Sequence, residues 1–323
     1  MKNLLLSAII SLYFLPCWGQ TKSETMIALA VVTPHQTDHL DESQSVRLEK
    51  KIVELVSKSG LSASKGGSNV IIYPVFSIEN EELVEGGMQN ITVIQANISL
   101  FIKQFDNDII FASVSKQIKG SGSSKQKAIN DIITKISVND VKFGQFIQEG
   151  KAKIIDYYET NCSTILAKAE TCSKRKEHEE AIALLMSVPE AVSCYSEALK
   201  KADMVYQAYQ NQRCNELLQQ AQSLYGGHQY MDALSVLSEL EVFSTQCSSD
   251  AKVLIKTIEG KISAQEKQEW DFKVKQYNDR LRFEEKQQNN KARLTEKWIN
   301  AARNIAVSYY NRKVNYNYVY HCL

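Results

Sequence analysis

Two histidines near the N-terminus have the spacing of a metal site. His35 and His39 stand four residues apart with Asp38 between them. On a helix this spacing would place both imidazoles on one face, where they could bind zinc. Pro34 and the turn-forming residues around the pair instead favour a solvated loop. We therefore predict no metal site here, and we keep a hydrolase or other enzyme built around His35, Asp38 and His39 as the alternative function.

A glycine-serine segment is the second candidate for chemistry. Residues 120–124 read Gly-Ser-Gly-Ser-Ser and precede a predicted helix, and glycines at such a place let backbone N–H groups approach an anion. The segment lacks the dinucleotide fingerprint and the Gly-Lys-Ser/Thr ending of phosphate-binding loops. The chain also lacks the Gly-x-Ser-x-Gly elbow of serine hydrolases. We predict a flexible strand-to-helix turn, with no catalytic residue and no cofactor.

The cysteines suggest disulfides. One of the seven lies in the N-terminal segment described below, which leaves six, an even number suited to an oxidising compartment. Cys162 and Cys194 have nearly the same separation as Cys214 and Cys247, and the two pairs hold equivalent places in a duplicated pattern. We predict one disulfide within each pair, with buried or free thiols as the alternative. Two cysteines are left over and nothing in their spacing requires a bond: Cys172 and Cys322.

Residues 1–19 have the layout of a secretory signal peptide. Lys2 precedes an apolar run over residues 4–15 that is too short to span a bilayer, and Gly19 ends the segment. We predict a periplasmic or secreted mature protein. Acylation of Cys17 is placed second, because the Phe-Leu-Pro before it lacks the small residues expected at a lipidated cysteine. Membrane association is thus allowed but not required.

Composition narrows the class of partner. The chain has 38 Lys and Arg against 37 Asp and Glu, and this balance gives no support to a nucleic-acid partner. Only four prolines and thirteen glycines occur in 323 residues, which argues against a disordered chain. The length allows two domains, each with its own core.

Residues 20–139 predict a small α+β domain. The predicted elements are, in order, a strand at 26–32, a helix ending near Gly60, strands at 69–78, 91–103 and 109–118, and a helix at 125–136. Asp106-Asn-Asp108 suits a hairpin turn between the last two strands. Residues 79–88 are expected to form an acidic loop. The order strand, helix, strand, strand, strand, helix predicts helices packed on a partly antiparallel sheet.

One segment of this domain resembles a known family. The end of the last strand runs into Gly120-Ser-Gly122-Ser-Ser, and residues 125–129 open a helix. This segment resembles the corresponding part of flagellar-assembly and related bacterial surface-lipoprotein domains, a fold group that includes curli-pore lipoproteins. The resemblance covers residues 25–136 and implies an envelope assembly or accessory role without catalysis. The chain departs from the group because it has no lipobox before Cys17.

Residues 140–260 predict an all-α domain of helical hairpins. The composition changes to strong helix formers, and one apolar pattern occurs twice at an offset of about fifty residues. Long helices are predicted at about 141–176 and 191–225, and short return helices at 177–187 and 228–240. The hairpins loosely resemble tetratricopeptide repeats, although their period is longer.

Residues 261–323 predict a long basic helix and an aromatic tail. Thirteen basic and seven acidic residues occur between Lys261 and Lys313, and short apolar seams begin at Trp270 and Leu294. Such a helix could bind a partner helix or an acidic surface, or it could pack back on its own domain. The alternating residues 314–320 predict an edge strand or a docking tail.

These features predict a secreted, non-enzymatic envelope protein that binds another envelope protein, as a scaffold or an assembly accessory factor. The groove between stacked hairpins and the aromatic tail are the expected contact surfaces. The candidate partner-binding residues, any of which could instead be core, are Tyr195, Tyr206, Tyr209, Trp270 and Trp298.

Overall fold

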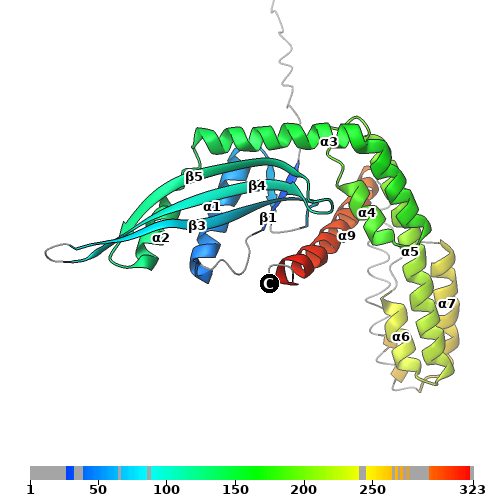
Figure 1. Cartoon of the computed structure of the whole chain (residues 1–323). Helices are drawn as coiled ribbons and strands as arrows, with labels where there is room; N and C mark the ends of the chain where they lie inside the picture. Colours follow the sequence, from blue (N-terminus) through cyan, green and yellow to red (C-terminus); the bar gives the residue numbers. More distant parts are fainter. Residues whose placement is uncertain are drawn as a thin grey trace, which may run out of the picture.

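The protein combines a mixed sheet with a long helical region (Figure 1), which confirms the predicted fold class. The computed structural model describes residues 27–32, 39–64, 67–85, 89–239, 245–263, 266–267, 270–271, 275 and 291–320. The signal peptide predicted at 1–19 lies outside the described residues, as do Cys17, His35, Asp38 and Cys322. None of the helices within these ranges combines the length and apolar composition of a membrane span.

The sheet has five strands in the order β2-β1-β3-β4-β5. β1 is parallel to β2 and β3, whereas β3, β4 and β5 are antiparallel to one another. The elements of this half are β1 (Ala28–Val31), α1 (Glu42–Lys58), β2 (Ser62–Ser64), β3 (Val70–Val84), β4 (Ile91–Gln104), β5 (Ile110–Gly122) and α2 (Lys125–Lys135). β2 is absent from the predicted order because its Ser-Ala-Ser sequence has no apolar alternation.

The acidic loop expected at residues 79–88 is wrong for its first part. β3 continues to Val84 and pairs with β4 as far as the Val84–Ile91 pair, with a bulge between Ile78 and Asn80. The side chains of residues 80–84 are exposed, so no apolar face shows in the sequence. Backbone hydrogen bonds to β4 hold this part of the strand.

The flexible turn predicted at residues 120–124 is also wrong for its glycines. Gly120 and Gly122 belong to β5. A Cβ atom on Gly120 would overlap the carbonyl oxygen of Ala128 and the side chain of Ile132, so the glycine lets α2 lie directly on the strand. Only Ser123 and Ser124 form the turn, and the Ser124 hydroxyl caps α2 by accepting from the Lys127 N–H at 3.4 Å.

The helical region contains two hairpins of the same design. Its elements are α3 (Val141–Lys174), α4 (His178–Met186), α5 (Tyr195–Gly226), α6 (Tyr230–Ser238), α7 (Thr245–Glu259) and α9 (Lys291–Tyr320). The turn before α4 and the turn before α6 hold left-handed residues at equivalent places, Lys176 with φ 65° and His228 with φ 60°. Each turn is closed by one backbone hydrogen bond of 2.9 Å. The Glu177 N–H donates to the Cys172 carbonyl in the first turn, and the Gln229 N–H donates to the Leu224 carbonyl in the second. The duplicated sequence pattern therefore folds into duplicated turns.

The structure joins both cysteine pairs that the repeat suggested. The Cα atoms of Cys162 and Cys194 are 6.5 Å apart, and those of Cys214 and Cys247 are 6.3 Å apart, both within the range that a disulfide spans. The first bond ties α3 to the N-cap of α5, and the second ties α5 to α7. Cys172 is a buried free thiol.

The buried side chains form one large and one smaller main cluster. The large cluster runs from the sheet through α3, α4 and the first half of α5, and it includes Ala302 of α9. The smaller one lies between the second half of α5, α6 and α7, with Trp270 added. The secondary structure therefore changes at residue 140, where a new domain was predicted to begin, but the hydrophobic core continues across this point.

The last described helix returns to the rest of the chain. α9 runs beside α4 toward the sheet (Figure 1), and it buries Ala302, Ala306 and Tyr310. Lys313 Nζ lies 2.7 Å from Asp106 Oδ1 in the β4–β5 turn. These contacts favour the alternative in which the helix packs on its own chain. The edge strand predicted at residues 314–320 is wrong, because α9 stays helical to Tyr320.

The disulfides generate a prediction about stability. We expect the double variant Cys162→Ser/Cys194→Ser to lower the free energy of unfolding by roughly 3–4 kcal/mol, because the bond closes a loop with a sequence separation of 32 residues. Urea denaturation measures this change. Cys172→Ser is the matched control and should leave both cross-linked peptides intact in a non-reducing peptide map. A cross-link that includes Cys172 would contradict the pairing.

Two glycines provide a matched test of the packing of α2 on β5. Gly120→Ala should destabilise the fold by about 1–3 kcal/mol, because the new methyl group has no space. Gly144→Ala should stabilise α3 by about 0.5–1 kcal/mol, because a Cβ there has no neighbour within 4 Å and alanine favours the helix. Thermal or urea unfolding measures both. If both substitutions changed the stability by the same amount and in the same direction, the close approach of α2 to β5 would be contradicted.

Candidate functional site

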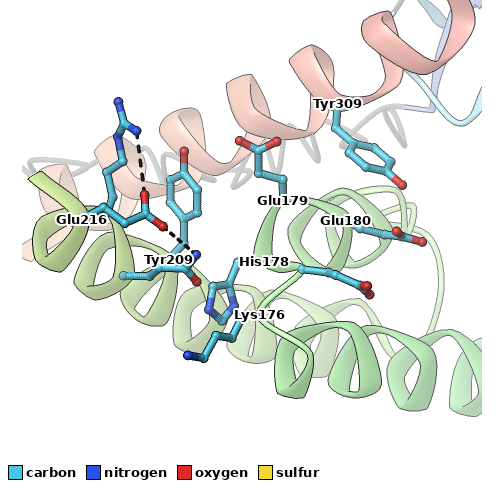
Figure 2. A pocket seen from close by; sticks show the side chains of 10 residues that line it. Lys176, His178, Glu179, Glu180, Tyr209, Glu216 and Tyr309 are labelled. Carbon is cyan, nitrogen blue, oxygen red and sulfur yellow. Dashed lines mark hydrogen bonds and ion pairs between the residues drawn. The ribbon is translucent and has the colours of Figure 1, made fainter. Parts of the chain in front are cut away.

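A cavity opens where α4, α5 and α9 meet (Figure 2), and we call it the α4–α5–α9 cavity. Its volume is about 390 Å³. The lining side chains come from the turn before α4, from the first turn of α4, from the middle of α5 and from α9. They are Lys176, Glu177, His178, Glu179, Glu180, Tyr209, Gln212, Arg213, Glu216 and Tyr309.

A second hollow continues from the first between α5 and α9. It has a volume of about 420 Å³ and shares Tyr209 and Arg213 with the α4–α5–α9 cavity. Its other lining is more apolar and includes Leu217, Ala301 and Ile305. We call it the α5–α9 hollow. One stretch of α5 thus presents a polar recess and an apolar recess side by side.

Local sequence explains why the charged residues collect at this end of α4. The apolar residues of α4, from Ala181 to Leu185, are buried. The left-handed Lys176 and the cap Glu177 start the helix immediately before His178. The first turn of α4 then carries Glu179 and Glu180, a composition that suits the positive end of a helix dipole.

His178 is unusual among the lining residues because it is 8% exposed and its Nδ1 atom has no hydrogen-bond partner among the described residues. Burial, aided by nearby Lys176, holds the pKa of the imidazole below its usual value. The ring is therefore neutral at pH 7 and has one nitrogen that accepts a hydrogen bond. Gln212 is similar, since its Nε2 donates to Glu216 at 2.9 Å while its buried Oε1 has no described partner.

One carboxylate of the cavity is directly paired with a base, and two others lie at the limit of an ion pair. Glu179 bonds to Arg312 of α9. Glu180 lies 3.9 Å from Lys168, and Glu216 lies 4.0 Å from Arg213. Among the ten lining residues, four are glutamates and two are bases, Lys176 and Arg213. The lining is therefore acidic overall.

The two lining tyrosines remain protonated at neutral pH. Burial raises the pKa of the Tyr309 hydroxyl to about 12, and burial also raises the pKa of Tyr209. Figure 2 shows the two rings on opposite sides of Glu179. They give the acidic cavity aromatic walls.

A thiol lies behind the cavity. The Cys172 sulfur and carboxylate oxygens of Glu177 and Glu180 are all within 4.8 Å of one another. Burial, followed by the charges of Glu180 and Glu177, raises the pKa of the thiol. A protonated thiol is a poor metal ligand and can instead donate a hydrogen bond to a carboxylate. This geometry fits a thiol–carboxylate cluster better than a metal centre.

The aromatic candidates from the sequence divide into core and surface residues. Tyr206 is 7% exposed and packs at 6.4 Å between ring centroids with Trp298, and Trp270 is 2% exposed and donates to Glu259 at 2.9 Å. α9 covers most of Tyr206, which also lines the α5–α9 hollow, whereas Trp270 belongs to the core of the second hairpin. Tyr195, Trp298 and Tyr209 are half-buried, and Tyr209 lines both recesses.

The sequence did not single out His178, Gln212 and Tyr309 as site residues. They come from three helices that are distant in the chain, and no spacing rule connects them. The one available signal was a histidine next to three glutamates at the start of a predicted helix.

The alternative site near the N-terminus is only partly described. His39 is exposed and lines a shallow recess of about 280 Å³ between the starts of α1 and α2. Asp41 is committed to capping α1, since its Oδ1 accepts from the Gln44 N–H at 2.8 Å and the Gln44 side chain accepts from the Asp41 N–H at 3.0 Å. The described part of this site thus offers one exposed imidazole.

Together, the fold and the cavity define a class: an α+β sheet joined to disulfide-linked helical hairpins that hold a polar recess. No protein-family model matches the chain, and no curated protein matches it. A solved structure that is similar in part is a minor lipoprotein from Acinetobacter baumannii, with 11% identity, a TM-score of 0.26, and coverage of 38% of this chain and 92% of that chain. A likeness of this size supports no conclusion about fold or function.

The buried histidine generates a prediction about pH. Because the folded protein keeps His178 neutral while the unfolded chain takes up a proton near pH 6.5, stability should fall as the pH is lowered through 6.5 toward the folded pKa. Urea denaturation between about pH 5 and pH 8 measures this fall in stability. The variant His178→Gln should lose the part of the pH dependence that comes from this histidine. Lys176→Met should raise the pKa of His178 in an NMR titration. A His178 pKa at or above 6.5 would contradict the expectation.

Proposed function

We propose that this protein is an exported, non-enzymatic binding protein whose α4–α5–α9 cavity and α5–α9 hollow accept a segment of another protein. The observation that carries the proposal is the continuity of the two recesses along α5, with Tyr209 lining both. Partly exposed aromatic side chains of this kind are frequent energetic centres of protein interfaces. The finer proposal is that the partner belongs to a bacterial envelope and that the protein serves as a scaffold or assembly accessory factor.

Export is supported by the cysteines. Two pairs at disulfide separation suit an oxidising compartment rather than a reducing cytoplasm. The predicted signal peptide points to the same compartment. Periplasmic or secreted localisation is therefore part of the proposal, and acylation at Cys17 remains its second form.

A binding role is supported by the chemistry of the lining. None of the residues that line the α4–α5–α9 cavity is a serine, threonine or cysteine, so this lining offers His178 no such hydroxyl or thiol to activate as a nucleophile. Nearby Cys172 is buried and its pKa is raised, which disfavours the reactive thiolate. An envelope hydrolase with its site in the α+β half is the alternative, and His39 is the described residue on which it would depend.

Position-specific cross-linking tests the binding role. The photoreactive residue p-benzoylphenylalanine replaces Tyr209 in the full exported chain and, as a matched control, replaces Met204, which is 64% exposed on the same helix and lines neither recess. We expect a discrete cross-linked protein from position 209 and several-fold less from position 204. Equal yields from both positions, or no product from either, would contradict the proposal.

A further inference from the structure

We propose that the α4–α5–α9 cavity binds the guanidinium group of an arginine side chain presented by the partner segment. This inference rests on the proposed binding role and deepens it by naming the chemistry that the cavity recognises. Three independent features of the lining support it: unused hydrogen-bond acceptors, an excess of carboxylates and two aromatic walls.

The unused acceptors require a ligand that donates hydrogen bonds. His178 is more than nine-tenths buried, and its Nδ1 has no partner among the described residues; in the neutral tautomer with the proton on Nε2, this Nδ1 accepts a hydrogen bond. The Glu216 carboxylate can only accept, so it fixes the orientation of the Gln212 amide by accepting a hydrogen bond from its N–H group. The amide oxygen of Gln212 is then the atom without a described partner. Buried acceptors that find no donor in the protein are satisfied by a bound group or by water.

The charge of the lining itself, four glutamates against Lys176 and Arg213, favours a cation over an anion. The carboxylates of Glu177, Glu179, Glu180 and Glu216 face Lys176 and Arg213 in the lining. Outside the lining, Arg312 bonds to Glu179 and Lys168 lies 3.9 Å from Glu180. An anion such as phosphate would meet the remaining carboxylates, and the glutamates in the first turn already complement the positive end of α4. A cationic group therefore fits the cavity and an anionic group does not.

The shape of the donors favours guanidinium over ammonium. A guanidinium group is planar, carries five N–H donors in one plane and stacks on aromatic rings, whereas an ammonium group is a compact point charge with three donors. Tyr209 and Tyr309 line the cavity on two sides, and Lys313 Nζ, which lies 5.3 Å from the centre of the Tyr309 ring, shows that a cation can stack there. Glu216, Gln212 and His178 supply acceptors at different places in the same lining.

One residue of the chain already imitates this ligand. The Arg213 guanidinium lies 4.0 Å from Glu216, at the limit of an ion pair, and both side chains are more than half exposed. An incoming arginine would compete with Arg213 for the Glu216 carboxylate. Removing the Arg213 charge should therefore strengthen ligand binding.

An NMR titration of the full chain with small probes tests the inference. The imidazole signals of His178 are followed while Nα-acetyl-arginine amide is added, and Nα-acetyl-citrulline amide serves as the neutral probe of the same shape. We expect saturable shifts with the arginine probe, at least about fivefold weaker binding of the lysine analogue, and no saturable shift with citrulline.

Variants of the cavity sharpen the test. Glu216→Gln should weaken binding of the arginine probe about tenfold, because a charge-assisted hydrogen bond is lost. Arg213→Gln should strengthen it several-fold. Glu197→Gln is the control, because Glu197 lies on α5 but outside the cavity, and it should change nothing; unfolding curves verify that each variant is folded.

Two outcomes would overturn the inference. Equal responses to arginine and citrulline would show that charge is not recognised. Shifts of His178 produced by zinc ions but not by the arginine probe would indicate a metal site instead. Either result, combined with a discrete cross-link from position 209, would reject arginine recognition while leaving the proposed binding role in place.

Discussion

The packing of α9 on α4 is the contact on which the candidate site depends. Tyr310 is 1% exposed, and Ala306 of α9 lies in one buried cluster with Ala183 of α4. Lys313 then extends to Asp106 in the β4–β5 turn, so the same helix joins the hairpins to the sheet. Without α9 the cavity would lose the wall that carries Tyr309, and Tyr206 would lose the ring of Trp298. One helix far along the chain thus closes a site formed by helices much nearer its middle.

The duplicated hairpins show how a repeat can acquire a site in one copy only. His178 and Lys176 in the first hairpin are replaced by Tyr230 and His228 at the equivalent places of the second. In the second hairpin the tyrosine hydroxyl and His228 Nδ1 are 3.2 Å apart, so the polar atoms satisfy each other. In the first hairpin the buried imidazole nitrogen has no described partner. The turn geometry is shared, but the unsatisfied acceptor is particular to the copy that α9 covers.

The disulfides and the cavity depend on the same helix. α5 carries Cys214, and its N-cap is Cys194, so both bonds act on it. Between these two cysteines lie Tyr209, Gln212 and Arg213, which supply much of the polar wall. Fixing both parts of α5 to neighbouring helices limits the motion of that wall. A binding surface held in this way loses less conformational entropy when a ligand binds.

Patterns in the sequence were enough to locate the elements that have a strong local signature. Period-two and helical apolar patterns located the long strands and the hairpin helices, and the repeat located the cysteine pairs, because each depends on residues close in sequence or on a duplication. The features that escaped it include β2, the exposed half of β3, the role of Gly120 and the helical end of α9. Backbone pairing with β4 decides the second half of β3, and the closeness of α2 decides the role of Gly120. The site was beyond reach for the same reason, since His178, Gln212 and Tyr309 meet only when α9 returns to α4. Local spacing cannot encode such a meeting, because long-range packing creates it.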